Sequence, residues 1–299
     1  MNLRELLPPE KHYNDMDQTR TIWLVTNSAS GSNDDGTVEL LQRCCGNAGF
    51  MVARHIHFPD EDLPKIADLR SAGIETVAVF AGDGTTNALI TRLYGWEGNV
   101  LVLPGGTMNI LYNRLHGYAE TEEVLEKIAS GKARTVRPGI VRCSRGDALA
   151  GLLVGPATAW NDVREAMRQN DLKAMMEGTA EALEQSLSAP TVICTDPPMG
   201  KREGYPLIML TPWDDGIAVA AYHSETVDEY VAQGVALLKH NFREGPHDDL
   251  GKVGRLRLRD LSGEPLHLLL DGEPVSATDK EAEFLLVLCE VDLLATIPE

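Results

Sequence analysis

Two short turns rich in glycine and hydroxyl residues carry the strongest chemical signal in the chain. Residues 80–87 read Phe-Ala-Gly-Asp-Gly-Thr-Thr-Asn, and residues 103–109 read Leu-Pro-Gly-Gly-Thr-Met-Asn. Glycine permits a sharp turn and lets a ligand approach the backbone closely. Thr85 or Thr86 can begin a helix, whose first N–H groups suit a phosphate. The carboxylate of Asp83 would repel a phosphate unless a divalent cation lies between them, so the pattern favours a Mg²⁺–nucleotide.

A third polar loop, at residues 27–31, supplies an amide, two hydroxyls and a glycine. Each loop alone also fits an ordinary connection from strand to helix, because Gly, Asp and Thr are common there. The usual nucleotide fingerprints are missing. No G-x-G-x-x-G follows the first apolar run, and the pair Gly31 and Gly36 is followed by Thr37 rather than by the lysine of a P-loop. Three such loops at one sheet edge favour a nucleotide site.

Apolar runs alternate with helical stretches through the first half of the chain. Strands are expected at residues 22–26, 50–58, 76–80 and 99–103, and helices at residues 37–48, 60–72 and 85–94. This repeat predicts a doubly wound parallel sheet with helices on both faces. The three polar loops then lie at the carboxyl ends of strands, where ligands bind in open α/β sheets.

Past about Gly139 the pattern changes to strands joined mainly by turns, which predicts an antiparallel β-sandwich. Strands are expected at residues 148–154, 191–195, 206–210, 217–222, 253–258, 265–270 and 284–289, and helices at residues 162–187 and 227–238. The sequence therefore predicts a polar lead-in at residues 1–20, an α/β nucleotide-binding domain at residues 21–138 and a β-sandwich domain at residues 139–299.

The composition indicates a globular protein and argues against nucleic-acid binding and membrane spans. The chain has 299 residues, of which 43% are hydrophobic and 24% charged, as in ordinary globular proteins of two domains. Its net charge of −18 argues against nucleic-acid binding, which depends on basic residues. Five scattered cysteines indicate reduced thiols, and residues 1–20 contain no apolar signal region. The longest apolar run, Phe284–Cys289, is far shorter than the roughly 20 residues of a membrane span, so we expect a soluble, cytoplasmic protein.

The order and spacing of the three loops resemble the catalytic domain of the diacylglycerol kinase family, which includes bacterial soluble lipid kinases, sphingosine kinases and ceramide kinases. The matching patterns are Gly-Asp-Gly-Thr-x-Asn at residues 82–87, Pro-x-Gly-Thr-x-Asn at residues 104–109, and Asn-x-x-Ser-Gly at residues 27–31. The resemblance extends over residues 22–117, and is thinner in the second domain.

The resemblance implies that ATP binds with Mg²⁺ on the first domain. The implied nucleotide-binding residues are Asn27, Ser30, Gly31, Gly82, Asp83, Gly84, Thr85, Asn87, Gly106 and Thr107. Two positions depart from the family pattern. Ala81 stands where the family usually has glycine, which is tolerated if its φ is negative, and Ile110 stands where the family often has aspartate.

Asp271-Gly272-Glu273 in the second half has two interpretations. Asp-Gly between apolar runs is a common hairpin turn. The family resemblance instead implies three catalytic carboxylates: Asp271 as the general base that takes the proton of a lipid hydroxyl, with Glu273 and Asp83 in the nucleotide or metal network. Phosphoryl transfer to an alcohol benefits from such a base, because a neutral alcohol is a weak nucleophile.

Asp215 also has two interpretations. Residues 213–217 fit a turn between strands, whereas the resemblance implies that Asp215 holds a Mg²⁺ outside the nucleotide pocket with main-chain oxygens of Pro212 and Ile217. Oxygen ligands suit that metal. The neighbouring Asp214 leaves the register of this site open.

Three further groups of residues, the arginines at 255–259, the methionines within 162–187 and two histidines, each have a structural and a functional interpretation. Arg255, Arg257 and Arg259 share one strand face, which is either a solvated face or a cationic patch for lipid headgroups. Methionines in residues 162–187 either pack against the sheet or line an acyl-chain site. His55 and His57 are expected to be structural, because no third ligand has metal-binding spacing.

The residue patterns together with the family resemblance predict an ATP-dependent lipid kinase, and the resemblance implies most simply one that converts diacylglycerol to phosphatidic acid, with its active site in the cleft between the domains. It would meet its lipid substrate peripherally at a membrane surface, with no nucleic-acid partner, and a homodimer is left open. The alternatives are a ceramide or sphingoid-base kinase, an NAD kinase and a non-catalytic nucleotide-binding regulator. NAD kinases share the Gly-Asp-Gly-Thr loop but also carry an Asn-Glu dipeptide, and no Asn here precedes Glu.

Overall fold

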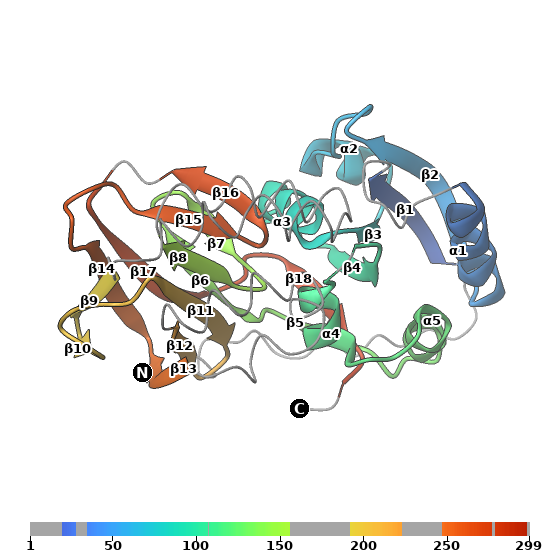
Figure 1. Cartoon of the computed structure of the whole chain (residues 1–299). Helices are drawn as coiled ribbons and strands as arrows, with labels where there is room; N and C mark the ends of the chain where they lie inside the picture. The colour runs from blue at the N-terminus through green and yellow to red at the C-terminus, as the bar shows by residue number, and fades with distance from the viewer. Residues whose placement is uncertain are drawn as a thin grey trace. The chain divides into compact units, whose positions relative to one another are not determined.

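The structure, a computed structural model, describes residues 20–27, 35–106, 108–155, 192–222, 247–276 and 279–297 (Figure 1). The chain forms two compact units: Met1–Pro138 with Leu288–Glu299, and Gly139–Val287. Among the described residues, no helix has the length and apolar character needed to cross a membrane.

The first unit is a six-stranded sheet with helices, in the order β2-β1-β3-β4-β18-β5. Its strands are β1 Arg20–Asn27, β2 Phe50–Phe58, β3 Thr76–Ala81, β4 Asn99–Pro104, β5 Arg134–Val136 and β18 Asp292–Ala295, and its helices are α1 Asp35–Asn47, α2 Ile66–Ser71, α3 Asp83–Arg92, α4 Ile110–His116 and α5 Thr121–Ala129. Neighbouring strands are parallel, except that β5 is antiparallel to β18. Every residue of β3 is buried, as expected for a central parallel strand covered on both faces.

The last strand, β18, lies in the first sheet, although we expected residues 139–299 to form the second domain. Leu293 pairs with Val100 of β4 on one side and with Val136 of β5 on the other, and its side chain is fully buried. Arg137 Nε donates to Asp292 Oδ1 at 2.6 Å, beside the point where the chain leaves the unit. The expected domain boundary therefore differs from the structure at its C-terminal end, because burial alone cannot say which sheet a short apolar strand joins.

The second unit contains two six-stranded sheets whose defined pairings are antiparallel, in the orders β10-β9-β14-β17-β6-β7 and β13-β12-β11-β8-β15-β16. The strands are β6 Gly139–Cys143, β7 Gly146–Ala148, β8 Leu152–Gly155, β9 Val192–Asp196, β10 Pro198–Met199, β11 Leu207–Trp213, β12 Gly216–Tyr222, β13 His247–Val253, β14 Arg255–Asp260, β15 His267–Leu270, β16 Glu273–Ser276 and β17 Glu281–Leu288. One apolar core draws on both sheets, for example Phe284 from β17 and Ile208 from β11. The predicted fold class, an α/β domain followed by an antiparallel sandwich, is confirmed.

Two expected elements differ from the structure, and two others lie outside the described residues. The helix predicted at residues 60–72 is reduced to α2, which begins after Pro64, since a proline disfavours helical conformation in the residue before it. The strand predicted at residues 148–154 is divided into β7 and β8 by Leu149–Gly151, whose backbone serves another purpose described below. The helices and methionines expected within residues 162–187, and the helix at residues 227–238, lie outside the described residues.

Candidate functional site

The two glycine turns of the first unit pack against each other. They follow the adjacent parallel strands β3 and β4, whose last residues Ala81 and Pro104 are partners in register. A Cβ added at Gly106 would lie 2.4 Å from the Cα of Gly82, and one added at Gly105 would lie 2.4 Å from the backbone nitrogen of Ala81. Contact between two backbones therefore requires these glycines, whether or not a ligand also approaches them.

Asp83 joins the first turn to the helix that follows the second. It is the first residue of α3, and its carboxylate accepts hydrogen bonds from the backbone N–H groups of Ile110 and Leu111, both at 3.2 Å. These amides begin α4, where a negative charge is favourable. The sequence predicts a divalent cation beside Asp83. In the structure the two helix amides also stabilise this carboxylate, and the cation stays a prediction.

Asn27, at the end of β1, completes this group. Its Nδ2 donates to Thr85 Oγ1 at 2.7 Å, which ties the start of the third polar loop to the first turn of α3. Gly84 and Asn87 also lie in the first turns of α3, whose N-cap is Gly82. The end of β1 and both glycine turns thus come together in one unit, as predicted. Three of the expected nucleotide contacts, Ser30, Gly31 and Thr107, lie outside the described residues.

The second glycine turn is closed by Asn109. This residue has φ 49°, a left-handed conformation that asparagine tolerates, and its side chain accepts from Gly106 N–H and donates to Gly106 O, both at 2.8 Å.

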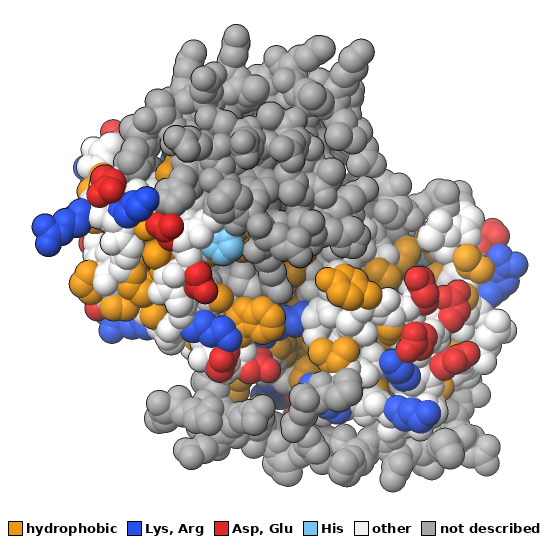
Figure 2. Space-filling view, turned by 60° about the horizontal axis from the view of Figure 1, so that its bottom comes forward, with side chains coloured by type: hydrophobic (Ala, Val, Ile, Leu, Met, Phe, Trp, Pro, Cys, Tyr) orange, Lys and Arg blue, Asp and Glu red, His pale blue; other side chains and the backbone are white. Residues whose placement is uncertain are grey.

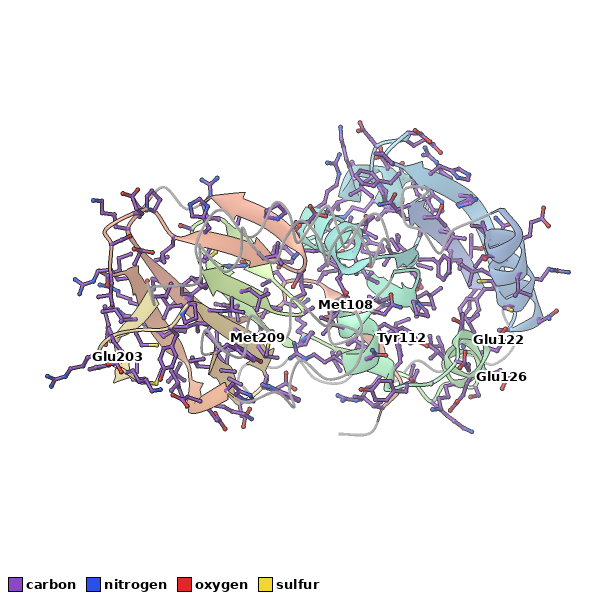
Figure 3. All side chains as sticks on the ribbon, viewed as in Figure 1. Met108, Tyr112, Glu122, Glu126, Glu203 and Met209 are labelled. Carbon is purple, nitrogen blue, oxygen red and sulfur yellow. The ribbon has the colours of Figure 1, made fainter. Side chains whose placement is uncertain are left out.

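The only other described non-glycine residue with positive φ is Asp271. Ala81 therefore has a negative φ and meets the condition for tolerating its methyl group. Ile110, the second departure from the family pattern, contributes its N–H to Asp83. Tyr112 continues α4 (Figure 3) and donates its hydroxyl to Ala119 O at 2.6 Å, which fixes the end of the helix.

Asp271 of the second unit, like Asp83, has a carboxylate that accepts hydrogen bonds from backbone N–H groups. Its carboxylate accepts hydrogen bonds from three consecutive backbone N–H groups, those of Leu149 at 2.8 Å and of Ala150 and Gly151 at 2.9 Å each. Its own N–H donates to Gly151 O at 3.0 Å, and the residue is 8% exposed. We call the N–H groups of Leu149–Gly151 the amide cradle. Three donors favour the ionised carboxylate and fix its position.

The hairpin interpretation of Asp271-Gly272 holds in the structure. β15 and β16 are joined by these two residues, which have φ values of 46° and 88° as a tight hairpin turn requires. Glu273 is exposed and pairs with Leu270 in the first register position after the turn. The turn therefore accounts for the sequence motif on its own, and a catalytic role for its carboxylates is a separate proposal.

Asp215 lies in the β11–β12 turn and forms an ion pair with Lys252. The Nζ of Lys252 is 2.8 and 2.9 Å from the two carboxylate oxygens, and its hydrogen bonds lower the pKa of Asp215. The ammonium group thus occupies a position beside the carboxylate that a cation would take. The expected main-chain ligands Pro212 and Ile217 face each other across the hairpin. Asp214 instead accepts from Gly139 N–H at 3.1 Å.

No cluster of three His, Cys, Asp or Glu side chains suited to a metal ion occurs among the described residues. The Asp215 site as the structure has it does not fit Mg²⁺, because an ammonium group already neutralises the carboxylate. His55 lies 2.9 Å from the hydroxyl of Thr26, and its ring centroid is 3.8 Å from that of His57, contacts that agree with a structural role.

Two of the three arginines of β14, Arg255 and Arg257, have acidic partners. Arg255 lies 2.8 Å from Glu283 and 3.3 Å from Asp196, and Arg257 lies 3.2 Å from Glu283. Figure 2 shows basic and acidic side chains interspersed on the described part of the face it presents. This arrangement favours the solvated-face interpretation over a cationic patch.

Sequence reasoning missed the amide cradle and a further ion pair beside it. Arg142 of β6 contacts Asp147 of β7 through two hydrogen bonds, at 2.8 and 2.6 Å. Backbone N–H groups leave no trace in side-chain types, and Leu149 and Ala150 fit an uninterrupted strand equally well. Gly151 was the single available signal of a break.

The fold and these turns define a class: an α/β unit with two glycine turns at the carboxyl ends of adjacent parallel strands, followed in the chain by a β-sandwich unit. Residues 21–141 match the model of the diacylglycerol kinase catalytic domain, which confirms the family resemblance for this part of the chain.

Solved structures agree with the fold. A diacylglycerol kinase from Bacillus anthracis str. Sterne is 15% identical, with a TM-score of 0.57 and coverage of 94% of this chain and 98% of that one. A candidate diacylglycerol kinase from the same organism is 14% identical, with a TM-score of 0.60 and coverage of 95% and 98%. At such identities the likeness shows the fold alone. A search of curated proteins found no match.

Proposed function

We propose that this protein is an ATP-dependent lipid kinase that transfers the γ-phosphate of ATP to the hydroxyl of diacylglycerol, giving phosphatidic acid and ADP, and that it meets this lipid at a membrane surface. One observation carries the proposal: the segment that matches the diacylglycerol kinase catalytic domain is also the one in which Asn27 and two glycine turns are brought together.

The nucleotide would bind on the first unit. The α3 helix begins at a glycine N-cap, so no side chain of its own caps its first turn, and helix N-termini attract phosphate. Asn27 and Thr85 would contact the nucleotide together with Ser30, Gly31, Gly106 and Thr107 of the neighbouring loops. Asp83 offers the hard carboxylate oxygens that Mg²⁺ prefers, so this residue fits the metal that accompanies ATP. When bound, Mg²⁺ would neutralise charge on the phosphates.

Asp271 would act as the general base. The proton of the lipid hydroxyl would pass to a carboxylate oxygen as the hydroxyl oxygen bonds to the γ-phosphorus and the bond to the ADP oxygen breaks. The amide cradle supports this role in one respect, because it keeps the carboxylate ionised and fixed, and opposes it in another, because each donor lowers the basicity of the oxygen that it binds. Glu273, two residues further on, is proposed to assist in the nucleotide or metal network.

A substrate panel tests the proposal. The purified chain is incubated with radiolabelled ATP and Mg²⁺, and with diacylglycerol, ceramide, sphingosine or NAD in parallel, the lipids being presented in mixed micelles. We expect label in phosphatidic acid. Label in a phosphorylated sphingolipid or in NADP would assign one of the alternative kinases, and ATP binding without transfer to any acceptor would assign a nucleotide-binding regulator.

A further inference from the structure

Arg142 and Asp147 form a two-point ion pair directly opposite each other in the β6–β7 hairpin. Arg142 Nε lies 2.8 Å from Asp147 Oδ1, and Nη2 lies 2.6 Å from Oδ2. The Asp147 side chain is only 7% exposed. A carboxylate is rarely buried without a partner, so the guanidinium makes this position of Asp147 tolerable.

Asp147 lies two residues before Leu149, the first residue of the amide cradle that holds Asp271. Ala148, fully buried and paired with Val141, separates it from the amide cradle, and Leu149 and Ala150 are buried as well. The backbone therefore has little freedom between the ion pair and the cradle. At the far end, a Cβ added at Gly151 would lie 3.2 Å from Leu210 O, so the segment is enclosed there too.

Three consecutive N–H groups can point at one carboxylate only while the backbone keeps this course. We infer that Asp147, held by Arg142, is a positioning residue for Asp271: the ion pair fixes the amide cradle, and the cradle fixes the carboxylate. This inference deepens the proposed function, because it assigns the support of the proposed general base. The competing interpretation is a cross-strand pair that only tightens a short hairpin.

Asp147→Asn separates the two interpretations, with Asp260→Asn as the matched control. Asp260 is a carboxylate of the same unit that is similarly buried, 6% exposed, and accepts bonds from Ser262 at a different turn. Amide hydrogen exchange of the purified chain without substrate is the first readout. We expect exchange at Leu149–Gly151 to be at least about tenfold faster in Asp147→Asn and unchanged in Asp260→Asn, because a loosened cradle opens more often. Unchanged exchange at these amides in Asp147→Asn would overturn the inference.

The second readout is the pH profile of kcat/KM for lipid phosphorylation. Weaker amide donors stabilise the carboxylate less, so we expect the acidic limb to move to higher pH in Asp147→Asn, with kcat lowered about tenfold and the KM for ATP unchanged. A lower kcat with an unmoved acidic limb would favour the hairpin interpretation.

A milder variant covers the case in which Asp147→Asn fails to fold. Arg142→Lys keeps the positive charge but loses the two-point contact, and should accelerate exchange at the same amides by a smaller factor. Since exchange requires no catalysis, a wild-type chain that phosphorylates no lipid would refute the proposed function while the exchange data still decide the inference about the cradle.

Discussion

The carboxylates of Asp83 in the first unit and Asp271 in the second are both held by backbone N–H groups, but in different local structures. Asp83 is partly exposed and accepts from two amides at the start of a helix, whereas Asp271 is buried in a hairpin turn and accepts from three consecutive amides. Both carboxylates organise the backbone around them. A motif carboxylate can therefore have a structural and a chemical role at once, and variants must separate the two.

The largest effect is expected for Asp271→Asn. Asparagine keeps one acceptor oxygen, so with Ala150 and Gly151 still bonded its NH₂ group would face the N–H of Leu149. We expect lipid phosphorylation to fall by at least about 100-fold if Asp271 is the base. We also expect the free energy of unfolding to fall by about 1–3 kcal/mol. Kinase assays and urea unfolding measure the two effects. The control variant Asp260→Asn should lose stability without losing kcat. Full activity of a folded Asp271→Asn chain would exclude Asp271 as the base.

Gly106→Ala tests the contact between the glycine turns. Its Cβ would lie 2.4 Å from the Cα of Gly82, a backbone atom that cannot move aside cheaply. We expect a loss of about 1–3 kcal/mol in the free energy of unfolding, as for other overpacked sites, and weaker ATP binding by calorimetry. Gly46→Ala in α1 is the control: nothing lies within 4 Å of its added Cβ, and alanine in a helix should be neutral or stabilising.

The first unit should be the more acid-sensitive because of His116. Burial lowers the pKa of His116 to about 4, so the folded ring stays neutral while the unfolded chain takes up a proton below about 6.5. The free energy of unfolding should therefore decrease as the pH falls from about 6.5 towards 4, by about 2 kcal/mol between pH 7 and pH 5. Urea unfolding at both pH values checks this. His116→Gln should flatten the dependence, and the exposed His57→Gln should not; equal slopes in both variants would contradict the account.

The smallest effect is expected at the exposed Asp215–Lys252 pair. Hydrogen bonds from Lys252 lower the pKa of Asp215, so the pair contributes stability above the unfolded pKa of this carboxyl, and the contribution is lost as the pH falls through the folded pKa. In Lys252→Met, NMR titration should show the pKa of Asp215 returning towards its ordinary value, with little change in stability. An unchanged pKa of Asp215 in Lys252→Met would contradict the assignment of this shift to Lys252.

The sequence predicts those parts of the molecule that depend on a recognisable pattern of side-chain types. The apolar runs of β3 and β4, the turns between strand and helix, and the Asp271-Gly272 hairpin all have distinct residue patterns. The membership of β18 in the first sheet does not, because four residues identify a strand but not its neighbours. The amide cradle is equally hidden, since it consists of backbone groups under apolar side chains.

The most direct test is the initial rate at which the purified chain transfers label from ATP to diacylglycerol in mixed micelles with Mg²⁺. We expect saturable formation of phosphatidic acid by the wild type, and a rate in Asp271→Asn lower by at least about 100-fold at unchanged affinity for ATP. Absence of lipid phosphorylation by a folded, ATP-binding wild-type chain would contradict the proposed function.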